Sequence, residues 1–206
     1  MEQLERNQSI LQKYIPEKAV PVIAEWIYKF DFKLKIKKNR SSKFGDYRPP
    51  VNGENHLITI NYGMNQYAFL ITLVHEIAHL SNYIKHKDMV KPHGEEWKLH
   101  YKLLMQQFLI PDIFPVDVIT ALRKYMNNPA ASSCTDINLL RVLKKYDLRQ
   151  NTIMLEDLPQ GAAFQYNNRK FIKGEQSRKR FRCKELGTNR LYLFNPLTEV
   201  TQVNSN

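Results

Sequence analysis

An α+β fold is predicted for this chain of 206 residues, and three features of the sequence predict it. Apolar side chains recur at helical spacing over most of residues 2–146. Two short segments within that region, 32–36 and 56–62, have the composition and alternation typical of strands. From about residue 150 onward, short β-type runs such as AFQYN and RLYLFN are separated by turn residues, which is typical of a small all-β module.

The helices expected in the first part are bounded by residues that start or stop helices. Pro16 separates the first two helical segments, and Asn65 stands where an N-cap is expected for the third. Gly94 precedes the fourth segment, and Pro111 and Pro115 separate it from the fifth. We therefore expect helices over 2–14, 17–30, 66–84, 95–108, 115–127 and 136–146.

The strands expected between the second and third helices differ in environment. Residues 32–36 alternate apolar side chains with lysines, which predicts a half-buried strand. We expect residues 57–62 to form the edge strand beside the 66–84 helix, where an extended peptide can add to the sheet. Residues 39–54 are rich in turn formers, which predicts a long loop.

Composition divides the chain into three segments. We predict a first domain over 1–128, a linker with a short helix over 129–149, and a small basic β module of four or five strands over 150–206. Residues 128–134 (NPAASSC) have linker composition, and the texture changes to short β-type runs after about 150.

Charge points to polyanions as partners. The chain has 31 Lys and Arg against 20 Asp and Glu, a formal net charge of +11, and nucleic acid is the commonest polyanion in a cytoplasm. Lysine and arginine neutralise phosphates, and exposed aromatic rings stack on bases. The best candidates for nucleic-acid contacts lie around Phe181 and after Phe171; they are Arg178, Lys179, Arg180, Arg182 and Lys184. The alternative is a solvated strand face, with both phenylalanine rings pointing into the core. Lys33, Lys35, Lys37 and Lys38 form a second basic stripe.

Several protein classes are excluded. Two cysteines, Cys134 and Cys183, are too few for a disulfide scaffold, and we expect both to be inert. The most apolar stretch, 67–80, is interrupted by charged and histidine residues and is shorter than the roughly 20 residues a bilayer requires. Glu2 and Glu5 stand where a signal peptide would be basic. We expect a cytoplasmic protein with no membrane association.

The motif His75-Glu76-Ile77-Ala78-His79 is an H-E-x-x-H sequence inside an expected helix. Residues i and i+4 share one helix face, so both imidazoles can reach one metal ion. Zinc lowers the pKa of a coordinated water to about 7, and Glu76 is placed to take its proton and pass it to a leaving amine. Apolar residues surround the motif, and a buried helix with these polar groups is costly unless they have partners.

A third ligand must come from outside this helix. His93 is the first candidate, because it lies at a loop-to-helix junction where the chain can turn back toward the motif. Glu95 or Glu96, which open the next helix, are the second candidates. His86 and His100 are the last.

Together these segments resemble the SprT-like zinc metallopeptidases, the family that includes the Spartan proteases of DNA–protein crosslinks. The matching elements lie within about residues 15–110; they are the strand FKLKIKK, then GDYRPP at 45–50, the strand ITIN at 58–61, LVHEIAH at 73–79 and H-G-x-x-W at 93–97. The resemblance implies a zincin-like fold for 1–128, zinc ligands His75, His79 and His93, and Glu76 as general base. It also implies hydrolysis of peptide bonds in DNA-associated proteins.

The C-terminal segment departs from the family pattern. Many bacterial members carry a Cys-rich zinc ribbon there, whereas Cys134 and Cys183 are 49 residues apart and cannot form a four-thiolate site. We therefore predict one Zn2+ per chain. Two functions remain: a zinc-dependent endopeptidase acting on nucleic-acid-associated proteins, or a nucleic-acid-binding or regulatory protein with a catalytically idle zincin fold. Whether Tyr47 or Arg48 stabilises an oxyanion also stays open.

Overall fold

The computed structural model describes residues 2–38, 43–51, 53–130, 136–147 and 153–203, with side chains from Glu5 onward. The chain divides into two compact units, Met1–Asp147 and Leu148–Asn206. Helices and a small sheet build the first unit, and a second sheet builds the other. The predicted α+β class is therefore confirmed.

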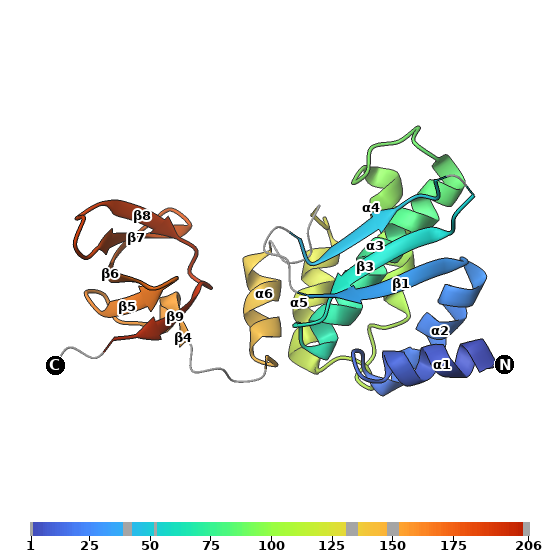
Figure 1. The fold of residues 1–206 in the computed structure, drawn as a ribbon, viewed down its shortest axis with the longest axis horizontal. Helices are drawn as coiled ribbons and strands as arrows, with labels where there is room; N and C mark the ends of the chain where they lie inside the picture. Colours follow the sequence, from blue (N-terminus) through green and yellow to red (C-terminus); the bar gives the residue numbers. More distant parts are fainter. Residues whose placement is uncertain (1, 39–42, 52, 131–135, 148–152, 204–206) are drawn as a thin grey trace. The chain divides into compact units, whose positions relative to one another are not determined.

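The first unit is a sheet covered by helices (Figure 1). α3 packs on β2 and β3, and α2 packs on β1. On the other face of β1 the lysines are exposed, as the alternation predicts. The elements are α1 (Glu2–Leu11), η1 (Glu17–Ala19), α2 (Val20–Lys29), β1 (Phe32–Lys37), β2 (Gly45–Arg48), β3 (His56–Asn61), α3 (Gln66–His86), α4 (Glu95–Gln106), α5 (Val116–Met126) and α6 (Ile137–Lys144).

The order of the sheet corrects two predictions. Among the described residues the order is β1-β3-β2, with β1 parallel and β2 antiparallel to β3. Because β3 pairs on both sides, the expectation that residues 57–62 form the edge strand is wrong; among the described strands, β1 and β2 are the two edges. The prediction of an uninterrupted loop over 39–54 is also wrong, since β2 lies within it. Gly45–Arg48 has no apolar alternation, and it becomes a strand because β3 offers a pairing edge.

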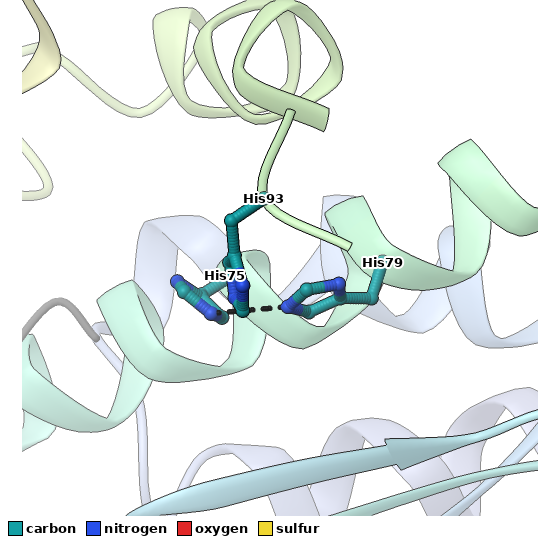
Figure 2. Close-up of side chains that lie close together, drawn as sticks. All are labelled: His75, His79 and His93. Atoms are coloured by element: carbon teal, nitrogen blue, oxygen red, sulfur yellow. Dashed lines mark hydrogen bonds between the residues drawn. The ribbon is translucent and has the colours of Figure 1, made fainter. Parts of the chain in front are cut away.

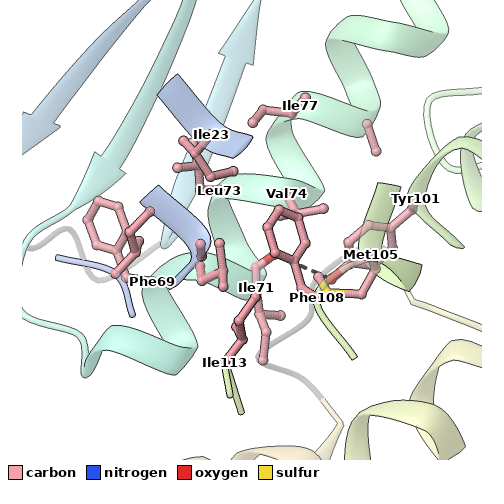
Figure 3. Close-up of a cluster of buried hydrophobic side chains, with 14 of the residues drawn as sticks. Ile23, Phe69, Ile71, Leu73, Val74, Ile77, Tyr101, Met105, Phe108 and Ile113 are labelled. Atoms are coloured by element: carbon pink, nitrogen blue, oxygen red, sulfur yellow. Dashed lines mark hydrogen bonds between the residues drawn. The ribbon is translucent and has the colours of Figure 1, made fainter. Parts of the chain in front are cut away.

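α3 is the central element of the first core. Asn65 caps it as predicted: its Oδ1 accepts from the backbone N–H groups of Tyr67 and Ala68 at 3.1 and 3.0 Å. Figure 3 shows Leu73 beside Ile23 of α2, and Val74 toward Phe108 beyond α4. With apolar neighbours on both sides, the helix buries polar residues of its middle as well as apolar ones.

α6 is fastened to the first unit by polar contacts. The Tyr146 hydroxyl, just after α6, donates to Asp117 Oδ1 of α5 at 2.7 Å. Asn65 Nδ2 donates to the Leu143 carbonyl at 2.9 Å. The Tyr146 ring also meets Tyr67 edge-on, at 4.9 Å between centroids. The short helix placed in the predicted linker 129–149 thus packs on the first unit; Cys134 lies outside the described residues.

The second unit is a twisted antiparallel sheet around its own core. Over the described residues its strand order is β4-β9-β5-β6-β7-β8. Phe164, Phe171, Phe194 and Val200 are central to the core, and buried Lys173 donates to the carbonyls of Glu156 and Leu158. The elements are β4 (Ile153–Met154), η3 (Leu155–Asp157), β5 (Ala163–Tyr166), β6 (Arg169–Ser177), β7 (Arg180–Glu185), β8 (Leu191–Phe194) and β9 (Glu199–Gln202).

Crossing a bilayer requires a helix of roughly 20 mostly apolar residues. None of the described helices is long and apolar enough to cross one.

Replacing Tyr146 by Phe should lower the stability of the first unit by about 1 kcal/mol, because Asp117 loses a hydrogen bond from the phenol. That bond is the largest cause of the lowered pKa of Asp117. A lowered carboxyl pKa stabilises the fold above the unfolded value of 3.8, and the contribution is lost as pH falls through the folded value. Urea unfolding at neutral and acid pH measures both effects. Tyr28→Phe is the control, because the Tyr28 side chain is exposed, and equal losses in both variants would contradict the prediction.

Candidate metal centre

Two imidazoles face each other on α3. His75 and His79 are one helical turn apart, and their Nε2 atoms lie 3.2 Å from each other. Figure 2 shows both rings pointing to the same side of the helix, with His93 entering from the segment before α4. The motif helix is buried as predicted, since His75 is only 5% exposed.

His93 completes a cluster of three. One ligand atom from each of the three histidines lies within 4.8 Å of the other two. Trp97, fully buried in the first turn of α4, contacts all three rings at centroid distances of 4.7 Å to His75, 5.2 Å to His79 and 4.8 Å to His93. The aromatic residue four positions after His93 therefore forms the wall against which the three imidazoles are ordered.

Burial keeps the three imidazoles neutral. Burial, followed by His79 and His93, holds the pKa of His75 well below its ordinary value. Burial and then His93 lower the pKa of His79 to about 3, and burial lowers that of His93. Neutral imidazoles keep a lone pair for a metal.

The residues fit a zinc ion. Three neutral imidazoles are a donor set of catalytic zinc sites. His75 Nδ1 and His93 Nε2 are buried and make no hydrogen bond within the described structure, so they are polar atoms that lack a partner. Nitrogens bound to tetrahedral zinc lie about 3.3 Å apart. The Nε2 atoms of His75 and His79 already have about that spacing. Ligand nitrogens of the cluster that lie farther apart would have to move closer together when zinc binds.

The other proposed third ligands lie elsewhere. Glu95 is 86% exposed and bonds Lys98 at 2.7 Å. Glu96 is outside the cluster of potential metal ligands found among the described residues. His100 Nδ1 bonds Ser81 Oγ at 2.8 Å, and its ring lies 6.0 Å from that of His86. The structure thus brings His93, and none of these four, to the H-E-x-x-H pair.

Glu76 lies in the same pocket. Its side chain is 7% exposed, and it lines a cavity of ≈ 380 Å³ together with the three histidines, Gly45 and Tyr47. A Cβ placed on Gly45 would lie 2.5 Å from Glu76 Oε1, so β2 can approach the carboxylate this closely only with glycine at position 45. This role of Gly45 could not be predicted from the sequence, because the turn formers of residues 39–54 favour a loop.

A comparison with protein families finds a similarity in the first unit. The family model described as SprT-like matches residues 23–119. Those residues lie in the first unit and contain the cluster and Glu76. Over these residues, the chain is similar to the SprT-like family. Curated proteins and solved structures gave no match.

The SprT-like assignment confirms the resemblance drawn from the sequence. The matched family is metallopeptidase-related, and the histidine cluster of the first unit has the donors to hold a metal. The roles of the individual residues remain predictions.

Outside the SprT-like match, the basic candidates of the second unit are all exposed. Arg180, Arg182 and Lys184 alternate along β7, and Arg178 and Lys179 form the turn before it. Phe171 and Phe181 are not exposed for stacking on bases, as the nucleic-acid interpretation expects them to be. Phe171 is buried in the core and Phe181 packs against this core, with Lys173 Nζ 4.2 Å from the Phe181 ring centroid. Cys183 is a free, buried thiol, and burial raises its pKa.

Replacing His93 by Ala in the SprT-like unit should weaken zinc binding by more than about 100-fold, because one of the three candidate ligands is lost. His100→Ala is the matched control, since that imidazole bonds Ser81 outside the cluster. Zinc content after dialysis against a competing chelator measures the difference. Equal zinc retention by His93→Ala and wild type would remove His93 from the ligand set.

Proposed function

We propose that this protein is a zinc-dependent endopeptidase that acts on nucleic-acid-associated proteins. The observation that carries the proposal is the grouping of His75, His79 and His93 with Glu76 in one pocket. Three neutral imidazoles supply a metal site, and the adjacent carboxylate supplies a base. The SprT-like match supports a zincin-like fold for the same residues.

In this mechanism the three histidines would hold one Zn2+ per chain. When bound there, zinc supplies Lewis-acid polarisation of the scissile carbonyl and lowers the pKa of water. Glu76 accepts a proton from the attacking water and passes it to the amine that leaves. Its burial excludes bulk water from the carboxylate, which strengthens its interaction with the transferring proton.

β2 is proposed to align the substrate. Among the described strands it pairs with β3 alone, so its other edge has backbone groups available for an added strand. Gly45 brings this edge to Glu76. An extended peptide paired with β2 would thus have a backbone carbonyl beside the carboxylate, and the specificity would come from side chains that enter the pocket.

Nucleic acid is proposed as the partner that brings substrate proteins. Residues 161–206 carry nine Lys and Arg and three Glu, which gives +6. Arg169 is not among the available cations, because it bonds Glu185 at 2.5 Å and lies 4.7 Å from the Tyr192 ring centroid. The exposed β7 side chains and the preceding turn are the candidates for phosphate contacts.

A second candidate function is a nucleic-acid-binding or regulatory protein with a catalytically idle zincin fold. The separate basic unit favours it, because a compact unit with its own core can bind a polyanion without hydrolysis elsewhere. The two functions share the metal and differ in what Glu76 does.

Replacing Glu76 by Gln should lower cleavage by at least about 100-fold, because the amide cannot accept the proton. The assay uses zinc-loaded protein and a basic DNA-binding protein as substrate, with and without single- and double-stranded DNA. Wild type is expected to cleave in the presence of DNA, and Glu76→Gln is expected to keep its zinc. Glu95→Gln serves as control, since that side chain is exposed. Absence of cleavage by zinc-loaded wild type under every condition would favour the idle fold.

Replacing Arg180, Arg182 and Lys184 together by Gln should weaken DNA binding and reduce the slope of log K against log salt by about 2–3, because each lost phosphate contact releases about 0.9 fewer counterions. Fluorescence anisotropy with labelled DNA at several salt concentrations measures the slope. The control replaces Lys33, Lys35 and Lys37 of β1, which carry the same charge on the first unit. A larger loss of DNA affinity in the control than in the β7 variant would show that the nucleic-acid interface lies on β1 instead of β7.

A further inference from the structure

Two side-chain positions of β2 face the pocket. In a strand, residues i and i+2 point to the same side, so Tyr47 projects in the direction in which a Cβ on Gly45 would meet Glu76. Both residues line the pocket of the three histidines. Two residues advance a strand by about 6.6 Å. Along the edge at which the substrate is proposed to lie, Tyr47 therefore comes two residues after Gly45, the residue that meets Glu76.

The Tyr47 hydroxyl is held in place by His56. The phenol oxygen lies 2.8 Å from His56 Nδ1 of β3, and the two rings stack at 5.8 Å with an interplanar angle of 23°. Tyr83 of α3, one turn beyond His79, packs against both rings at 6.2 and 5.9 Å. Three aromatic rings from three elements thus fix one hydroxyl at the pocket wall.

The neighbouring polar groups are less suited to stabilise charge there. Arg48 points to the other side of β2, is 63% exposed and pairs with Asp46 at 2.9 Å. Lys87 lines the pocket but is exposed, and its ammonium lies 5.0 Å from the Tyr83 ring centroid. Water screens an exposed charge, whereas burial, Tyr83 and Asp88 raise the pKa of Tyr47. The phenol consequently keeps its proton at neutral pH.

We propose that the Tyr47 hydroxyl donates a hydrogen bond to the oxygen of the scissile carbonyl as that carbon becomes tetrahedral, and that His56 is the positioning residue for this hydroxyl. The inference rests on the proposed peptidase function. Tyr47 forms no covalent bond and keeps its proton; in the tautomer with hydrogen on Nδ1, His56 donates to the phenol oxygen while the hydroxyl hydrogen is donated to the substrate oxygen. Such a donor accelerates the reaction only if its bond strengthens as negative charge develops.

The test compares Tyr47→Phe with wild type in the zinc-loaded full chain. Tyr47→Phe should lower kcat by about 100-fold and change KM by less than about twofold, as expected for one oxyanion donor. Tyr62→Phe is the control, because this tyrosine is 54% exposed and does not line the pocket. Zinc content is measured for each variant, and loss of zinc from Tyr47→Phe would show a structural role and overturn the proposal.

Binding provides a readout besides activity. A phosphinic peptide has a charged tetrahedral centre in place of the scissile carbonyl, whereas an ordinary peptide of the same sequence has a planar one. Calorimetry should show that Tyr47→Phe lowers the affinity for the phosphinic peptide by about 100-fold. The affinity of the ordinary peptide, measured in a Glu76→Gln background, should stay within about twofold. Equal losses for both peptides, or no loss for either, would overturn the proposal.

Variants of His56 separate positioning from structure. His56→Leu should lower kcat by about 10-fold with KM unchanged, and His56→Asn, whose side chain can still bond the phenol, should restore most of the loss. Equal activity of the Leu and Asn variants would exclude the positioning role. If zinc-loaded wild type neither cleaves a peptide nor binds the phosphinic peptide, the peptidase function itself fails and the inference with it. If wild type does both and Tyr47→Phe matches it, the inference alone fails.

Discussion

The burial of α3 is the constraint on which the site depends. A helix with apolar neighbours on two sides can bury histidine and glutamate only if their polar atoms find partners or stay uncharged. His75 and Glu76 are 5% and 7% exposed, and the three imidazoles meet the cost by remaining neutral beside Trp97. That neutrality leaves nitrogen lone pairs directed into one pocket, which is the electronic state a metal ligand needs.

The register of β2 against β3 is a second constraint on the site. Because Gly45 pairs with Ile60 and Tyr47 with Ile58, glycine meets Glu76 and tyrosine enters the pocket. A slip of one residue would turn both positions away from α3 and direct Asp46 and Arg48 toward it. The bond from Tyr47 to His56 and the contact of both rings with Tyr83 oppose such a slip.

The features that could be predicted from the sequence are those set by local chemistry. Asn65 caps α3 because its side chain satisfies nearby N–H groups, and His75 and His79 share a face because of helical periodicity. His93 could be placed near them from the loop-to-helix junction. β2 could not be predicted, since its strand state comes from pairing with β3 rather than from its own composition. The burial of Phe171 and Phe181 could not be predicted either, because their interleaving with basic residues does not show which face of a strand is buried.

The metal centre and the basic β7 residues depend on different cores, and this makes their roles separable. The first core packs around α3, whereas the second is built from β-sheet aromatics and the buried Lys173. Substitutions at positions without shared partners have additive effects, so the loss of the histidine cluster in one unit and the loss of exposed charge in the other should affect binding independently. Catalysis on a nucleic-acid-bound protein would require both units together. Suppose that loss of the histidine cluster leaves nucleic-acid binding intact, that loss of the β7 charges leaves metal binding intact, and that each change alone abolishes cleavage. The second unit would then be the part that delivers substrate to the first.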